Sequence, residues 1–218
     1  MNDKMNHDML FYGQKVCFIG AHPDDIELGC GALIAQIAKN TDVLCITLSD
    51  NQKNPDLSNL VQEHYASMAT LGVPRENIIL GSFETRRFPE ARQEILEYMI
   101  GINRQHHPEI VFVHSHADIH QDHQTITAEA LRAFRGVTVL GFDVLRSSYG
   151  FFPNFLVQVT EEDVARKLKA LAEYKTYASR YYFSPDITRA TLIRYGALVE
   201  RPFAEGFDTL RIIGAFGH

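Results

Sequence analysis

The stretch AHPDDIELGCG, residues 21–31, decides the fold, because it joins a strand to a helix and places ionisable side chains at the junction. The apolar run KVCFI, residues 15–19, comes directly before it and has the composition of a buried strand. Residues 26–39 follow, with apolar residues three and four apart, which predicts a helix. A strand that leads through a short turn into a helix is the opening unit of a parallel α/β sheet.

The same alternation of strand and helix continues outward along the chain. Further strand-like apolar runs occupy residues 42–48, 77–80, 109–114 and 137–142. Helical periodicity occupies residues 57–71, 91–105 and 122–134. Because β-α-β units cross over in the right-handed sense, the first 142 residues predict a Rossmann-like, doubly wound, mostly parallel sheet with helices on both faces.

The rest of the chain predicts a C-terminal extension packed on the same core. Its expected elements are a strand at 155–159, helices at 161–177 and 185–195, and a closing strand at 209–214. We find no linker, repeat or low-complexity segment, and 218 residues suit one compact unit. A single domain over residues 1–218 is therefore expected.

Composition and charge exclude several classes of protein. The 21 basic and 27 acidic residues give a net charge of -6, and no Lys/Arg block could follow a phosphate backbone, so nucleic acid is not an expected partner. Residues 1–13 lack the apolar core of a signal peptide, and no stretch reaches the roughly 18 apolar residues of a membrane span. Three cysteines without a CxxC pair do not predict a disulfide framework. A soluble cytoplasmic protein is expected.

Two clusters of ionisable residues follow two of the predicted strands. His22, Asp24 and Asp25 follow the first strand, and HSHADIHQDH, residues 114–123, ends and follows the fourth. Pro23 disfavours helix at the residue before it, so the first cluster is expected in a stiff turn. An aspartate before a helix is most often only an N-cap, and a lone histidine is usually structural. Because the carboxyl ends of parallel strands share one crevice, two such clusters there favour chemistry over coincidence.

The residue types of the two clusters are those of a catalytic metal site. Two imidazoles and one carboxylate with open positions suit a catalytic Zn²⁺, and Fe²⁺ can use the same set. Zinc lowers the pKa of a bound water, and a carboxylate beside it can take the proton. We therefore expect one of the two adjacent aspartates to bind metal and the other to act as a base.

The motifs AHPDDIELGCGA and DIHQDH together closely resemble those of the PIG-L/LmbE-like family of zinc-dependent N-deacetylases. Residues 63–73, 152–179 and 201–211 also resemble later segments of that family. The resemblance implies that His22, Asp25 and His123 hold the zinc. It also implies a small-molecule substrate, an N-acetylated amino sugar of the N-acetylglucosamine type or its conjugate, and suggests a homo-oligomer.

The resemblance further implies catalytic roles for three residues. Asp24 would act as the general base that activates the zinc-bound water and then return the proton to the leaving nitrogen. His120, as imidazolium, would help to stabilise the tetrahedral oxyanion, a kind of contribution that is often the largest catalytic effect. Asp122 would tune or orient that imidazole.

Departures from the family pattern limit what is implied about the substrate. Leu60 stands where some members carry an arginine, and Asp118 stands where some carry a tyrosine. The aromatic-rich stretch at 149–155 could line an acceptor site or belong to the core. Candidate substrate contacts after other strand ends are Ser49, Asn51, Arg86 and Arg87.

Alternatives from other classes remain at this point. A nucleotide- or sugar-binding module is suggested by Gly29 and Gly31, but GxGxxG is absent, and Asp24 and Asp25 would repel a pyrophosphate. A non-haem Fe(II) enzyme could use the same ligands, although such sites usually lie on a jelly-roll sheet. A relative that kept the fold for interaction only is disfavoured, because Asp24, His120 and His123 are all present.

Overall fold

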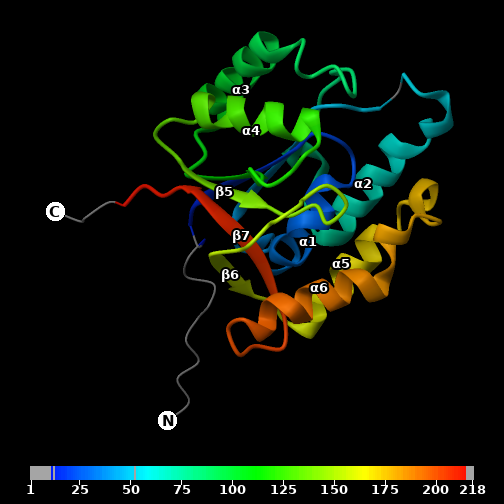
Figure 1. Ribbon diagram of the computed structural model, residues 1–218. Helices are drawn as coiled ribbons and strands as arrows, with labels where there is room; N and C mark the ends of the chain where they lie inside the picture. Colours follow the sequence, from blue (N-terminus) through cyan, green and yellow to red (C-terminus); the bar gives the residue numbers. More distant parts are fainter. Residues whose placement is uncertain (1–10, 12, 52, 215–218) are drawn as a thin grey trace.

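A seven-stranded sheet with the order β3-β2-β1-β4-β5-β7-β6 forms the centre of the computed structural model, which describes residues 11, 13–51 and 53–214 (Figure 1). Most of segment 1–13, which the expectation about a signal peptide concerns, lies outside these residues. The strands are β1 (Lys15–Gly20), β2 (Asp42–Thr47), β3 (Ile78–Leu80), β4 (Ile110–His114), β5 (Thr138–Phe142), β6 (Phe155–Gln158) and β7 (Ala204–Arg211). The longer helices are α1 (Asp25–Ile37), α2 (Leu60–Leu71), α3 (Arg92–His106), α4 (Gln121–Ala133), α5 (Glu161–Leu171) and α6 (Pro185–Ala197).

Strands β1 to β5 pair in parallel, and helices cover both faces of the sheet. Helices α1, α2 and α5 pack together below the sheet in Figure 1, and α3 and α4 pack together above it. The predicted α/β fold is confirmed. Every helix within the described residues is too short or too polar to cross a bilayer.

The strand β1 shows why its sequence is apolar without a break. Phe18 packs in the core cluster that contains Leu33 of α1, and its neighbour Ile19 packs in the cluster that contains Ile95 of α3 and Ile126 of α4. Successive side chains of a strand point to opposite faces, and here both faces are covered by helices. This burial fixes the end of β1, and hence the turn that follows it, firmly in place.

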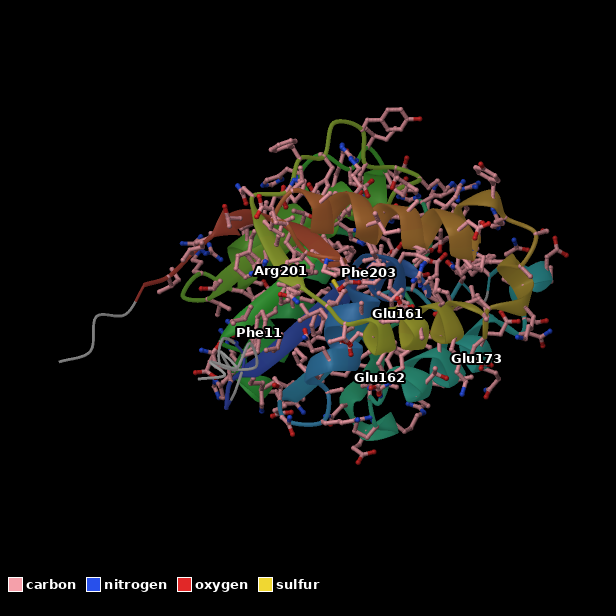
Figure 2. All side chains as sticks on the ribbon, turned by 90° about the horizontal axis from the view of Figure 1, so that it is seen from below. Phe11, Glu161, Glu162, Glu173, Arg201 and Phe203 are labelled. Atoms are coloured by element: carbon pink, nitrogen blue, oxygen red, sulfur yellow. The ribbon has the colours of Figure 1, made fainter. Side chains whose placement is uncertain are left out.

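The C-terminal extension joins the same sheet. Strand β7 pairs antiparallel with β5 on one side and with β6 on the other. Helix α5 begins at a capping box formed by Thr160 and Asp163, with Glu161 and Glu162 in its first turn (Figure 2). It ends at Leu171 rather than at 177, and a separate 3-10 turn covers Lys175–Tyr177.

The closing strand begins five residues earlier than the sequence pattern predicted. Glu205 lies in its buried half, where a charged residue is not expected. Its carboxylate accepts a hydrogen bond from Lys167 Nζ at 2.7 Å and from the backbone N–H groups of Ala32 and Leu33 at 2.9 and 2.7 Å. The Glu205 carboxylate is therefore satisfied by a lysine on α5 and two backbone N–H groups on α1. Its charge interrupts the apolar pattern, which is why the sequence did not predict the first part of this strand.

Candidate metal centre

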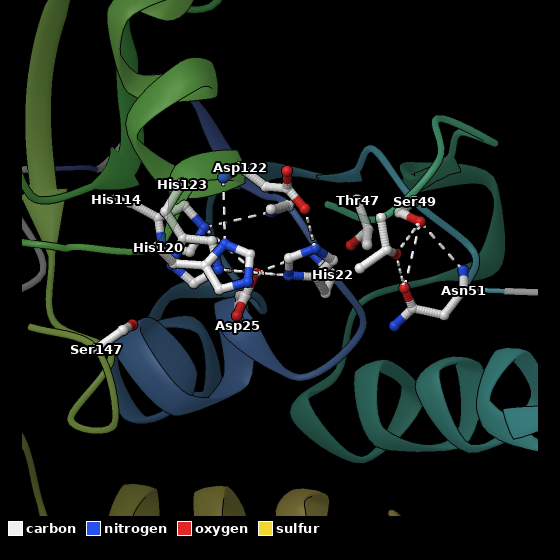
Figure 3. Close-up of polar contacts among 12 residues, drawn as sticks. His22, Asp25, Thr47, Ser49, Asn51, His114, His120, Asp122, His123 and Ser147 are labelled. Carbon is white, nitrogen blue, oxygen red and sulfur yellow. Dashed lines mark hydrogen bonds and ion pairs between the residues drawn. The ribbon is translucent and has the colours of Figure 1, made fainter. Parts of the chain in front are cut away.

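The carboxyl ends of β1 and β4 bring the two predicted clusters together. Figure 3 shows the imidazoles of His22, His120 and His123 gathered around Asp25. His22 lies in the turn between β1 and α1, and His120 is the residue directly before α4. The prediction that the clusters converge is confirmed.

Three donor atoms in this cluster form a nearly equilateral triangle. Nδ1 of His22 lies 3.5 Å from Oδ2 of Asp25, Nε2 of His123 lies 3.4 Å from the same oxygen, and the two nitrogens are 3.3 Å apart. Ligands at 2.0–2.2 Å around a tetrahedral Zn²⁺ stand roughly 3.3–3.5 Å from one another. The triangle therefore fits one face of a tetrahedral ion.

The imidazole of His22 contacts a second carboxylate through Nε2, the nitrogen that is not part of the triangle. Its Nε2 lies 3.0 Å from Oδ2 of Asp122, which also accepts the backbone N–H of Arg86 at 2.6 Å. Burial alone would lower the pKa of His22, but the carboxylates of Asp122 and Asp25 raise it to about 9. A metal held through Nδ1 requires that nitrogen to be deprotonated, while Nε2–H stays on Asp122 in the usual carboxylate–histidine arrangement.

The imidazole of His123 has an equivalent partner in Asp118. Nδ1 of His123 lies 2.8 Å from Oδ2 of Asp118, and the Ser147 hydroxyl donates to the same oxygen at 2.8 Å. Oδ1 of Asp118 accepts the backbone N–H of His120 at 2.8 Å. Burial, with the neighbouring His114, lowers the pKa of His123 to about 4, which favours its neutral form. Asp118, which the sequence marked only as a departure, thus anchors this side of the site.

His114 at the end of β4 is a third buried imidazole beside the triangle. Its ring stacks on that of His123 with centroids 3.7 Å apart. Its Nε2 accepts the backbone N–H of Ala21 at 3.2 Å and lies 3.3 Å from Oδ2 of Asp25. Geometry alone would also allow a metal on Asp25, His114 and His123, or on His22, His120 and His123. Because Nε2 of His114 accepts the Ala21 N–H, the set of His22, Asp25 and His123 fits an ion better than the first of these.

Asp24 lies at the N-cap position of α1, yet its side chain makes no capping hydrogen bond. Its backbone adopts a φ of 108°, a strained value for a residue other than glycine. The side chain is buried and lines the cavity at the site. Burial raises the pKa of Asp24 well above its ordinary value, the Asp25 carboxylate adds to this, and His22 opposes it. The simple N-cap interpretation therefore does not account for Asp24.

Asp25, in contrast, is held ionised. Burial alone would raise its pKa, but His123 and His114 lower it well below the ordinary value. Its Oδ2 also accepts the backbone N–H of His22 at 2.8 Å. The two adjacent carboxylates therefore have opposite environments, which suits different roles.

His120 covers the triangle on the side of the cavity. It stacks on His123 with centroids 4.4 Å apart, and its Nδ1 accepts the backbone N–H of Asp122 at 3.2 Å. Burial, together with the charge of His22, lowers its pKa. The Asp122 carboxylate, which was expected to orient His120, lies in contact with His22 and with the N–H groups of Arg86 and Phe88.

A cavity of about 690 Å³ opens over the cluster. Ser49, Asn51 and Arg86 line it, as the sequence suggested. The hydroxyls of Ser49 and Thr85 both donate to Oδ1 of Asn51, which leaves the Asn51 amide N–H groups as donors. Arg87 is not part of the lining and pairs with Glu90 at 3.0 Å.

Two further features named from the sequence, the stretch 149–155 and Leu60, do not contribute to this cavity. Among the described residues, none from 149–155 lines it, and Phe151 packs on Tyr195 in a small core cluster. Leu60 is fully buried against Tyr174 and Tyr177, so it belongs to the core. Two arginines that also line the cavity lie in irregular segments that periodicity does not mark: Arg146 and Arg180.

The sequence of this chain matches both a family profile and a known bacterial protein. Residues 17–134 match the sequence profile of the family described as PIG-L, GlcNAc-PI de-N-acetylase. The chain is 31% identical over 166 residues to the uncharacterized deacetylase YaiS of Escherichia coli (strain K12), covering 72% of this chain and 89% of YaiS.

Two solved structures share the fold. The conserved protein TT1542 from Thermus thermophilus matches with a TM-score of 0.74 and 19% identity, covering 93% of this chain and 97% of the other. The N,N'-diacetylchitobiose deacetylase from Pyrococcus horikoshii matches with a TM-score of 0.73 and 20% identity, covering 90% of this chain and 84% of the other. At these identities the likeness concerns the fold alone.

Proposed function

Because the chain belongs to the GlcNAc-PI de-N-acetylase family, PIG-L, we propose that it is a zinc-dependent hydrolase that removes the acetyl group from an N-acetylated amino sugar. The observation that carries the proposal is the triangle of donor atoms from His22, Asp25 and His123, with sides of 3.3 to 3.5 Å. Its size suits zinc, and each imidazole in it is backed by a carboxylate.

The protein's own residues would handle the protons of the reaction. A bound zinc would supply Lewis acidity, which polarises the acyl carbonyl and lowers the pKa of a water. Asp24 would take a proton from the attacking water, whose oxygen forms the new bond to the carbonyl carbon. Asp24 would then deliver that proton to the nitrogen as the C–N bond breaks, which releases acetate and a free amine. The absence of a capping bond leaves its carboxylate available for this work.

His120 would stabilise the negative charge that develops on the carbonyl oxygen. Its Nδ1 already accepts the Asp122 N–H, so its remaining donor is Nε2–H, and it lines the cavity. We therefore propose that it acts as a neutral hydrogen-bond donor rather than as the imidazolium expected from the resemblance. A fixed donor of this kind needs no reorganisation during the reaction.

Ser49, Asn51 and Arg86 would contact the rest of the substrate. The Asn51 amide oxygen is engaged by two hydroxyls, so its N–H groups would donate to sugar oxygens. The backbone of Asn51 and of Arg86 has positive φ, at 57° and 68°, which is uncommon outside glycine and frequent at functional sites.

The test combines metal analysis with an assay of acetate release. The purified protein should contain about one zinc per chain and release acetate from N-acetylglucosamine or its simple glycosides. Chelation should abolish the release, and added zinc should restore it. A protein that instead held iron, consumed oxygen and released no acetate from any N-acyl sugar would overturn the proposal in favour of the Fe(II) alternative.

A further inference from the structure

Two guanidinium groups line the cavity from segments outside the proposed metal site. Arg146 follows β5, and Arg180 lies between two 3-10 turns that precede α6. Each stands over a tyrosine ring of the cavity wall: Cζ of Arg146 is 5.3 Å from the Tyr182 centroid, and Cζ of Arg180 is 4.8 Å from the Tyr177 centroid. Aromatic faces attract and orient such cations.

The two tyrosines beneath the arginines pack on a common phenylalanine. Phe183 packs against Tyr177 and Tyr182 with centroids 5.4 and 5.2 Å apart, and its side chain is buried. Burial and the Asp24 carboxylate raise the pKa of Tyr182, and both Arg180 and Arg146 act to lower it, which places both guanidinium charges near the same phenol. The two positive charges therefore converge on one wall of the cavity.

Neither guanidinium forms an ion pair with a carboxylate in the described part of the chain. The lysine of the same cavity behaves differently, because Lys53 pairs with Glu84 at 2.6 Å. The Asp24 carboxylate lines the same cavity and Arg146 acts on it electrostatically, but the two do not form a direct ion pair. The two guanidinium groups therefore keep N–H donors that can meet an anion entering the cavity.

We propose that Arg146 and Arg180 form an anion subsite, which binds a phosphate or carboxylate group attached to the amino sugar. This inference rests on the proposed deacetylase function and names its substrate class as an anionic N-acetylated sugar conjugate. Guanidinium groups match both anions, because their fork of N–H donors can meet two oxygens at once.

The test compares three substrates with the zinc-loaded full-length protein. They are methyl N-acetylglucosaminide, N-acetylglucosamine 1-phosphate and a glycolate glycoside of N-acetylglucosamine, which are neutral, phosphorylated and carboxylated. At least one anionic substrate should exceed the neutral one by about tenfold or more in kcat/KM, because hydrogen bonds between charged groups are stronger than those between neutral groups. The anionic substrate with the higher kcat/KM shows whether the subsite prefers a phosphate or a carboxylate.

Substitution of Arg180 decides whether this subsite causes the preference. Arg180→Gln should lower the anionic-to-neutral ratio of kcat/KM by about tenfold, and Arg180→Lys should keep part of it. Arg189→Gln is the matched control, because Arg189 pairs with Glu161 outside the cavity and should leave the ratio unchanged. A ratio near one in the wild type, or a ratio unaffected by Arg180→Gln, would overturn the subsite.

Failure of the deacetylase proposal would look different. If none of the three substrates released acetate, calorimetric binding of the phosphorylated and neutral sugars to the same zinc-loaded protein would still decide the subsite. Tighter binding of the phosphorylated sugar that is lost in Arg180→Gln would support it. Equal binding of both sugars, or a difference that survives the substitution, would overturn it.

Discussion

At the scale of single residues, the atoms that each carboxylate contacts support the role proposed for it. Asp122 lies against Nε2 of His22 and Asp118 lies against Nδ1 of His123, so we propose that each positions an imidazole. Oδ2 of Asp25 lies near the other nitrogen of each ring, Nδ1 of His22 and Nε2 of His123. Asp24 stands apart, since its side chain makes no capping bond and burial raises its pKa. The contacts therefore support three different proposed roles for four similar side chains.

Asp24→Asn tests the base. The amide keeps the shape of the side chain but cannot accept a proton, so we expect kcat for acetate release to fall by about 10²–10⁴. Zinc content should stay at the wild-type level, because the three proposed ligands are untouched. Asp186→Asn, in the exposed first turn of α6, serves as the control and should behave as wild type. A variant with near wild-type kcat would remove Asp24 from this role.

Asp118→Asn tests the support of His123. An amide cannot hold Nδ1–H as a carboxylate does, so we expect zinc affinity to fall by about 10–100-fold. Competition with a chromophoric chelator measures this directly. Asp42→Asn, which alters only an exposed pair with Lys15, should leave the affinity unchanged. Unaltered zinc affinity in Asp118→Asn would contradict the role assigned to this carboxylate.

Sequence motifs marked the residues that we propose to hold the metal, but not the residues that we propose to support them. His22, Asp25 and His123 follow strand ends in recognisable motifs, and strand ends converge in any parallel sheet. Asp118 and Arg180 make contacts that depend on the path of a loop or a 3-10 turn. No periodicity encodes such paths, so the contact of Asp118 with His123 and the position of Arg180 in the cavity emerged only from the structure.

At the scale of elements, apolar periodicity was sufficient to predict an element wherever a strand is buried on both faces or a helix is buried on one face. It predicted β1 to β5 in their order, and their parallel pairing is confirmed. It misplaced β7, because the buried half of that strand contains Glu205. The charge is balanced by Lys167, which lies 38 residues away in sequence, and local patterns do not report such a partner.

The buried pair of Lys167 and Glu205 offers a test of how the extension is attached to α1. Lys167 Nζ also donates to the Leu28 carbonyl at 2.7 Å, so one ammonium joins α5, β7 and α1. Lys167→Met leaves the Glu205 charge buried without a partner and should lower the free energy of unfolding in urea by about 3–5 kcal/mol.

The double variant supplies the control for this pair. Lys167→Met combined with Glu205→Gln removes both charges while an amide oxygen can still accept from α1, so most of the lost stability should return. A single variant as stable as the wild type would show that the pair contributes little to holding α1.

At the scale of the whole molecule, we propose that the chain unfolds as one domain. Strand β7 lies between β5 and β6, so the C-terminal extension cannot leave without breaking the sheet. Urea unfolding followed by far-UV circular dichroism and by tyrosine fluorescence should give coincident transitions. Two separated transitions would indicate that the extension forms an independent unit.

Zinc should stabilise the whole fold, because its proposed ligands join the end of β1 to the start of α4. A ligand that binds only the folded state adds about 2.7 kcal/mol when its free concentration is 100 times its Kd. The urea midpoint of the metal-free protein should therefore rise as zinc is added. His123→Ala should lose this rise, whereas Asp24→Asn should keep it, since only the former removes a proposed ligand. An equal rise in all three proteins would place the stabilising zinc elsewhere and refute the ligand assignment.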